Sequence, residues 1–130
     1  MIHSAPEFVE LTPEMKERLD SFRDENEPTA KLGDVASRVI FEDDHLRIWE
    51  MILEPGEASD LHQHDLDYYL VISEGDYVAG VTLEDDPVDS FLSKVPESGN
   101  TVFVPKGGTE WAYNVGKETF REILIERKNS

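Results

Sequence analysis

Two histidines one residue apart, His62 and His64, are the side chains of this sequence best suited to chemistry. The residues around them have the composition of a β-strand, and successive side chains of a strand point to opposite faces of the sheet. Both imidazoles therefore point to one side, within reach of a single metal ion at nitrogen–metal distances of about 2.0–2.1 Å. In an unbroken strand the same face also carries a phenol and three apolar side chains, namely Tyr68, Leu66, Leu70 and Ile72. The pattern predicts a pocket with a polar mouth and an apolar floor.

Turn residues border this strand at both ends. A Glu-Pro-Gly-Glu run, residues 54–57, precedes it, and a Glu-Gly-Asp run, residues 74–76, follows it. Proline presets φ and glycine accepts positive φ, so both runs are typical of turns. From Gly56 to Gly75 the spacing is Gly, five residues, His, one residue, His, three residues, Tyr, six residues, Gly.

A second segment, GNTVFVPKGGTEWAYN, follows residues 76–98 and runs from Gly99 to Asn114. Its spacing is Gly, five residues, Pro, one residue, Gly, two residues, Glu110, three residues, Asn. In this order the two segments resemble the two signature motifs of the cupin superfamily. The resemblance implies an all-β fold, a single-domain cupin jelly-roll β-barrel.

The resemblance also implies that the two motifs face each other inside the barrel, with Glu110 pointing toward His62 and His64. Those two histidines match two of the family's four metal ligands. Tyr68 stands where the family has a glutamate, and Glu110 stands where it has a histidine. Two imidazoles and one carboxylate suit non-haem Fe(II), although Mn, Ni or Zn could also bind. The absence of cysteine excludes thiolate ligands.

Each of these residues also has a purely structural interpretation. The two histidines could be polar residues at the rim of a pocket that holds no metal. Glu110 would face solvent after a one-residue change of register. Tyr68 is a poor ligand while protonated, because a phenol has a pKa of about 10. It is therefore a packed side chain with a satisfied hydroxyl, a direct ligand, or a catalytic acid or base.

Further polar residues near the motifs or in the tail are expected at the surface: Asp60, Asp65, Asp67, Tyr69, His3 and His45. Asp67 and Tyr69 have the opposite parity to the histidines, which places them on the outer face of the strand. Asp60 and Asp65 could instead hydrogen-bond the histidines.

The charge balance excludes several classes of partner. The chain of 130 residues has 12 Lys and Arg against 29 Asp and Glu, a net charge of −17. Such a chain repels phosphate backbones and anionic membranes, so neither nucleic acid nor a membrane is an expected partner. The charge favours solubility, and a second interpretation is that it steers a cationic substrate. The N-terminus lacks the basic and apolar segments of a secretory signal, which predicts a cytoplasmic protein.

Residues 1–34 are expected to form an N-terminal extension with one short helix. Thr12 is a good N-cap and Pro13 suits the first helical position. Met15, Leu19 and Phe22 then form an apolar stripe at helical spacing. Residues 1–11 show no clear period, and we expect them to lie on the surface or against a partner subunit.

Residues 35–130 are expected to form the barrel. Short apolar runs separated by turns predict eight or nine strands. The expected strands are 35–41, 46–53, 61–73, 77–83, 91–95, 101–104, 110–115 and 119–126. The strand at 46–53 has apolar residues on both parities, so we expect it to be covered on both faces.

Two functions remain open. The first is a small metalloenzyme that acts on a small molecule, with the metal as Lewis acid or O₂-activating centre and Tyr68 as a catalytic acid or base. The second is a non-catalytic protein that binds a small ligand and whose metal site is degenerate, as the departures at Tyr68 and Glu110 would indicate. Cupins are commonly dimers, so the resemblance also implies a homodimer.

Overall fold

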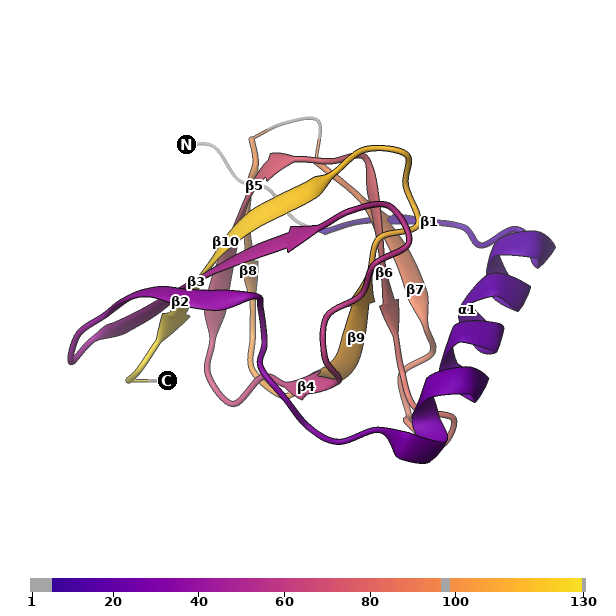
Figure 1. Ribbon diagram of the computed structural model, residues 1–130. Coiled ribbons are helices and arrows are strands. Elements are labelled where there is room, and N and C mark those ends of the chain that lie inside the picture. The colour runs from indigo at the N-terminus through magenta and orange to yellow at the C-terminus, as the bar shows by residue number, and fades with distance from the viewer. Residues whose placement is uncertain (1–5, 97–98, 130) are drawn as a thin grey trace.

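Two five-stranded antiparallel sheets face each other, and one helix lies outside them (Figure 1). This computed structural model describes residues 6–96 and 99–129. The first sheet contains, in spatial order, β1 (Glu7–Val9), β7 (Phe91–Lys94), β6 (Tyr77–Val81), β9 (Thr109–Tyr113) and β4 (His62–Gln63). The second contains β2 (Arg38–Glu42), β3 (Leu46–Leu53), β10 (Phe120–Arg127), β5 (Tyr68–Glu74) and β8 (Thr101–Val104). This arrangement confirms the predicted all-β jelly roll with one short helix.

The second sheet turns only one of its faces to the core. Trp49, Met51 and Leu53 of β3 alternate on the buried face. On the other face Ile52 is 42% exposed, and the carboxylate of Glu50 accepts hydrogen bonds from two arginines, Arg38 and Arg121. The prediction that this strand is covered on both faces is therefore wrong, because no further layer covers the outer side among the described residues.

The helix α1 (Pro13–Asn26) begins as its sequence predicts. The side chain of Thr12 accepts a hydrogen bond from the backbone N–H of Met15 at 3.1 Å, which satisfies one free donor of the first turn. Leu19 is fully buried in a cluster with Ala79, Val81 and Trp111 of the first sheet. The helix therefore covers the outer face of that sheet, and a 3₁₀ turn (Glu27–Thr29) follows it.

The N-terminal segment is more ordered than its sequence indicates. Residues Glu7–Val9 form strand β1, which pairs with β7 and extends the first sheet. Three residues are too few to show a period, so the pattern could not reveal this strand. Residues 1–5, with His3, lie outside the described part. The division of the chain after residue 34 stays a prediction, since strand pairing does not define an independently folding unit.

The predicted strand at 61–73 is two strands in different sheets. β4 ends at Gln63 and pairs with β9, whereas β5 begins at Tyr68 and pairs with β10 and β8. The chain crosses from one sheet to the other between them. The break preserves the facing of the key side chains, because His62, His64 and Tyr68 are all at least 96% buried.

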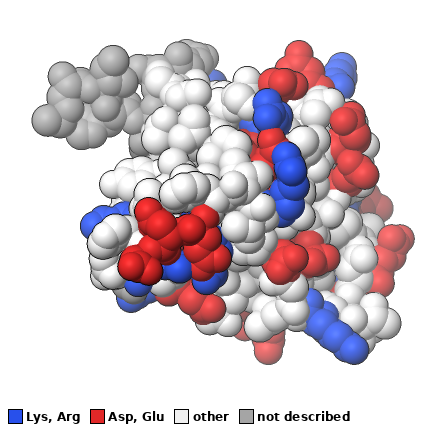
Figure 2. Space-filling view, turned by 60° about the vertical axis from the view of Figure 1, so that its left-hand side comes forward, with Lys and Arg blue, Asp and Glu red and all other residues white. Residues whose placement is uncertain are grey.

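Acidic side chains gather in separate groups on the face shown in Figure 2, with Lys and Arg beside them and a broad uncharged area between.

Within the described residues, no helix has the length and apolar character needed to cross a membrane.

Candidate metal centre

Strand pairing brings the two motifs together. His62 of β4 lies directly opposite Glu110 of β9, and residues opposite each other in an antiparallel pair project to the same face. His64 is then fixed by two backbone hydrogen bonds. Its N–H donates to the carbonyl of Gly108 at 2.9 Å, and the N–H of Gly107 donates to its carbonyl at 2.8 Å. Gly107 has φ of +120°, which favours glycine at this turn.

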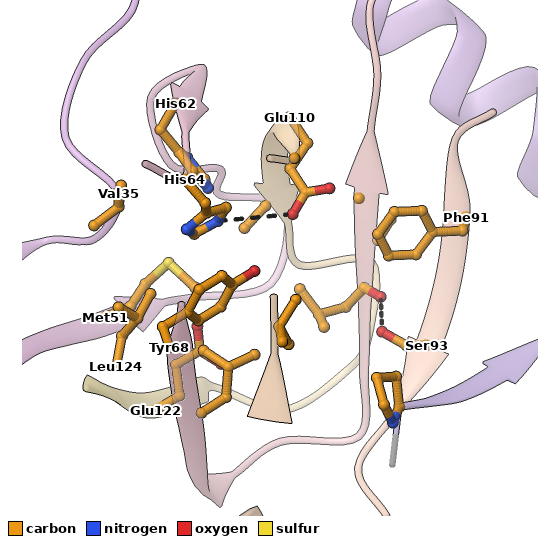
Figure 3. A pocket seen from close by; sticks show the side chains of 18 of the residues that line it. Val35, Met51, His62, His64, Tyr68, Phe91, Ser93, Glu110, Glu122 and Leu124 are labelled. Atoms are coloured by element: carbon orange, nitrogen blue, oxygen red, sulfur yellow. Dashed lines mark hydrogen bonds and ion pairs between the residues drawn. The ribbon is translucent and has the colours of Figure 1, made fainter. Parts of the chain in front are cut away.

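The side chains of His62, His64 and Glu110 converge on one point, as predicted. Their potential ligand atoms all lie within 4.8 Å of one another. Oε1 of Glu110 is 4.0 Å from Nε2 of His64 (Figure 3), and the two imidazole rings are 4.8 Å apart and nearly perpendicular. Both histidines are 3% exposed, so the two imidazoles are shielded from bulk water.

The hydrogen bonding of His62 prepares its free nitrogen for a ligand. The backbone carbonyl of Asp60 lies 2.8 Å from Nδ1 of His62 and can only accept a hydrogen bond. Nδ1 therefore carries the proton, and Nε2 keeps its lone pair. A backbone carbonyl that fixes the tautomer in this way is common behind metal-bound histidines. The contribution of Asp60 comes from its carbonyl, whereas its carboxylate accepts from the N–H of Asp34.

His64 lacks such a partner. Its Nδ1 is buried and has no hydrogen bond with any described residue. Burial, with a smaller effect of His62, lowers the pKa of His64 to about 3, and burial also lowers the pKa of His62. Both rings are therefore neutral at pH 7, which is the state that a metal ligand requires.

Glu110 is less buried than the histidines, with 21% of its side chain exposed. Burial, with a smaller effect of the charge of Asp86, raises the pKa of its carboxyl to about 7. At pH 7 the contact between Glu110 and His64 is not an ion pair, because the imidazole of His64 is neutral. A cation between the two side chains would favour the ionised carboxylate.

Tyr68 packs against this group. Its ring stacks on His64 with centroids 4.1 Å apart and an angle of 17° between the planes. Burial and the charges of Glu110, Glu122 and Glu126 raise the pKa of its phenol. The hydroxyl is therefore protonated at neutral pH and can donate a hydrogen bond. Its role as a ligand or as a catalytic group stays a prediction.

The three converging residues and Tyr68 line a cavity of about 280 Å³ between the two sheets. Much of the remaining wall is apolar, including Met51, Leu70, Val104, Phe120 and Leu124. Two carboxylates, Glu110 and Glu122, lie in this wall. None of the described residues that line it is a lysine or an arginine. The predicted pocket with an apolar floor is confirmed.

Glu122 is the lining residue that the sequence did not reveal. It is 4% exposed, and burial, with a smaller effect of Glu110, raises the pKa of its carboxyl to about 8. It alternates with Phe120 and Leu124 along β10, but Ile123 and Ile125 form an equally apolar set on the other parity. The local pattern therefore does not decide which set faces the core.

The other candidates lie outside the cavity, as expected. Asp65 and His45 are exposed. Asp67 accepts a hydrogen bond from the N–H of Lys106, and Tyr69 contacts the exposed Phe103. Asn114, the last residue of the second motif, is fully buried, and its side chain donates to two backbone carbonyls. Its role is to hold the turn beside β10.

The donor set fits a divalent metal. Two neutral imidazoles and a carboxylate are the ligands of non-haem Fe(II) sites, and Mn, Ni and Zn accept them too. An ion at about 2.1 Å from each ligand keeps neighbouring ligand atoms roughly 3.0–3.4 Å apart. Small side-chain movements would close the present spacing to this value. Such an ion would accept the lone pair of Nε2 of His64, which faces Glu110, and would give the buried carboxylate of Glu110 a positive partner.

Solved structures share this fold. A cupin domain from Bordetella pertussis Tohama I aligns with a TM-score of 0.59 and 22% identity, over 75% of this chain and 97% of that chain. An RmlC-like cupin family protein with a double-stranded β-helix fold, from Methanocaldococcus jannaschii, gives 0.50 and 21%, over 73% and 93%. A conserved protein of unknown function from Streptococcus pyogenes gives 0.50 and 23%, over 70% and 71%. No family model and no curated protein matches the sequence.

Proposed function

This chain has the jelly-roll fold of small single-domain cupins, and on that premise we propose that it is a metalloenzyme that acts on a small molecule. A divalent ion would be held by His62, His64 and Glu110. When bound, the metal supplies Lewis-acid chemistry, or O₂ activation if it is iron. Fe, Mn, Ni and Zn are all compatible with the ligand set.

One observation supports this proposal above the others. Two neutral, buried imidazoles and a carboxylate converge within 4.8 Å in a cavity whose described lining holds no lysine or arginine. Burying such a carboxylate without a positive partner costs free energy, and a cation removes that cost. A metal is the cation that also uses the imidazole lone pairs.

The remaining side chains of the cavity would bind and orient the substrate. Tyr68 can donate a hydrogen bond from its protonated hydroxyl while its ring holds His64 in place. The apolar wall excludes water and selects for shape. A cavity of about 280 Å³ lies just below the range of about 300–1,000 Å³ that is typical for drug-sized ligands, so the substrate is small.

Metal analysis of protein purified without an affinity tag tests the proposal. We expect one divalent ion per chain in the wild type, trace metal in His62→Ala, and a sharp decrease in Glu110→Ala. His45→Ala is the matched control, because it removes an exposed imidazole that does not line the cavity, and it should keep the full metal content. Trace metal in the wild type, unchanged by these substitutions, would contradict the proposal.

Replacing Tyr68 with phenylalanine separates its possible roles. We expect Tyr68→Phe to keep the metal content of the wild type, because the hydroxyl stays protonated and a protonated phenol is a poor metal ligand. The ring can still stack on His64. Catalytic turnover, once a substrate is found, should fall by roughly 10²–10⁴-fold if the hydroxyl transfers a proton. Loss of metal in this variant would instead make Tyr68 a ligand.

The non-catalytic alternative has one observation in its favour. Tyr68 replaces the family's usual carboxylate ligand and is packed as an aromatic side chain. A protein that only binds a ligand would need the cavity and no metal. The metal analysis decides between the two.

A further inference from the structure

Glu122 is a buried acid that the proposed metal group does not use. It projects from β10, in the sheet opposite His62 and Glu110, and lines the cavity. Its side chain has no hydrogen-bond or ion-pair partner within residues 6–96 and 99–129. Glu126, on the same face of the same strand, is paired: its carboxylate accepts a 2.6 Å hydrogen bond from the indole N–H of Trp49. Of these two glutamates, Glu126 is already paired and only Glu122 is available to bind a ligand.

The surroundings of Glu122 select the chemistry of that ligand. Figure 3 shows Glu122 below Tyr68, with Met51 and Leu124 nearby and the three converging residues above. The two glutamates are the only acidic side chains among the described lining residues, and none of those residues is a lysine or an arginine. An anionic ligand would therefore find no positive charge in this wall and would oppose ionisation of Glu122. An ammonium group would favour the ionised carboxylate and pair with it, which a neutral ligand cannot do, so a cation fits best.

We propose that the cavity recognises a small molecule with a protonated amine and a short apolar body, and that Glu122 pairs with the ammonium group. The inference deepens the proposed function and rests on it in one respect, since the other end of the molecule would face His62, His64 and Glu110. The apolar wall contacts the body of the ligand. The net charge of −17 acts in the same direction, because it raises the local concentration of cations at the surface.

A matched ligand series tests the inference on the full chain after treatment with a chelator. Butylamine, 1-butanol and butyrate have similar short alkyl chains and carry a positive, a neutral and a negative head group at pH 7. Their binding can be followed by NMR titration of isotope-labelled protein. We expect butylamine to bind at least about tenfold more tightly than either of the others. Equal or tighter binding of 1-butanol or butyrate would overturn the inference, because Glu122 would then act as a hydrogen-bond donor or not at all.

Two substitutions locate the effect. Glu122→Gln keeps the shape of the side chain and should lower the affinity for butylamine at least about tenfold, to the level of 1-butanol, while keeping the metal content. Glu126→Gln is the control, since it removes a buried carboxylate from the same strand but leaves an oxygen for Trp49. It should bind butylamine as the wild type does. Unchanged affinity in Glu122→Gln would overturn the inference, and so would loss of metal, which would make Glu122 a metal ligand.

Failure of the two proposals can be told apart. His62→Ala should lose the metal and still bind butylamine in preference to butyrate. A wild type that holds no metal but shows the preference, with its loss in Glu122→Gln, would refute the metalloenzyme and support the amine site. A wild type that holds one metal ion but shows no preference would refute only the amine site.

Discussion

Zinc added to chelator-treated protein, at about a thousand times its dissociation constant, is expected to raise the free energy of unfolding by about 4 kcal/mol. The ion would bind the folded chain alone, because β-pairing is what brings Glu110 opposite His62. Zinc is a suitable probe since it has no redox chemistry and accepts this ligand set. For a chain of this size the change corresponds to an increase in Tm of roughly 10–20 °C, measurable by thermal unfolding followed by circular dichroism.

His64→Ala should abolish this stabilisation, because it removes one of three ligands from a buried site. The variant also loses the stacking contact with Tyr68, so the comparison must be the change in Tm on adding zinc and not the Tm itself. His45→Ala should keep the full zinc effect. A shift that persists in His64→Ala would place the zinc elsewhere on this acidic chain.

Glu122→Gln is expected to become more stable relative to the metal-free wild type as the pH rises. The carboxyl of Glu122 has a pKa of about 8 in the folded chain, against an ordinary value of 4.5. Between these values the unfolded chain has lost the proton and the folded chain keeps it. The wild type therefore loses stability with rising pH, by up to about 1.4 kcal/mol per pH unit. Glutamine does not titrate, so the difference in the free energy of unfolding should shift by roughly 3–4 kcal/mol in favour of the variant between pH 5 and pH 8.

Urea unfolding of both proteins at pH 5, 6, 7 and 8, with a chelator present, measures this difference. The neutral histidines His62 and His64 also change stability with pH, but they are common to both proteins and largely cancel. Glu74→Gln, an exposed carboxylate, is the control and should differ from the wild type by less than about 0.5 kcal/mol throughout. A pH-independent difference for Glu122→Gln would show that this carboxyl is ionised in the folded chain.

Features set by local chemistry were predictable. The parity of a His-x-His pair is a property of the extended backbone, so His62 and His64 share a face wherever the strand lies. The helix at Pro13–Asn26 follows from the cap at Thr12 and the apolar stripe that begins at Met15. The resemblance of the two motifs to those of cupins implied that Glu110 faces the histidines, and the pairing of His62 with Glu110 agrees with this.

Features set by pairing between distant segments were not predictable. The sequence around Leu66 gives no sign that the chain leaves one sheet for the other, because extended residues look alike in both. β1 forms because the backbone of β7, at the edge of the first sheet, pairs with it. Which face of β10 turns inward, and with it the burial of Glu122, is decided by the core cluster in which Phe120 and Leu124 pack.

The sequence alone thus determined the fold class and the three residues that converge, because strand parity pairs the two histidines and the resemblance to the cupin motifs implies the jelly roll and the facing of Glu110. Only the tertiary structure decided that His62 and His64 are dry and neutral, that Tyr68 stacks on His64, and that an unpaired Glu122 shares their cavity. Whether a side chain is buried depends on the residues that pack over it. The residues that surround His62, His64, Tyr68 and Glu122 come from strands of both sheets.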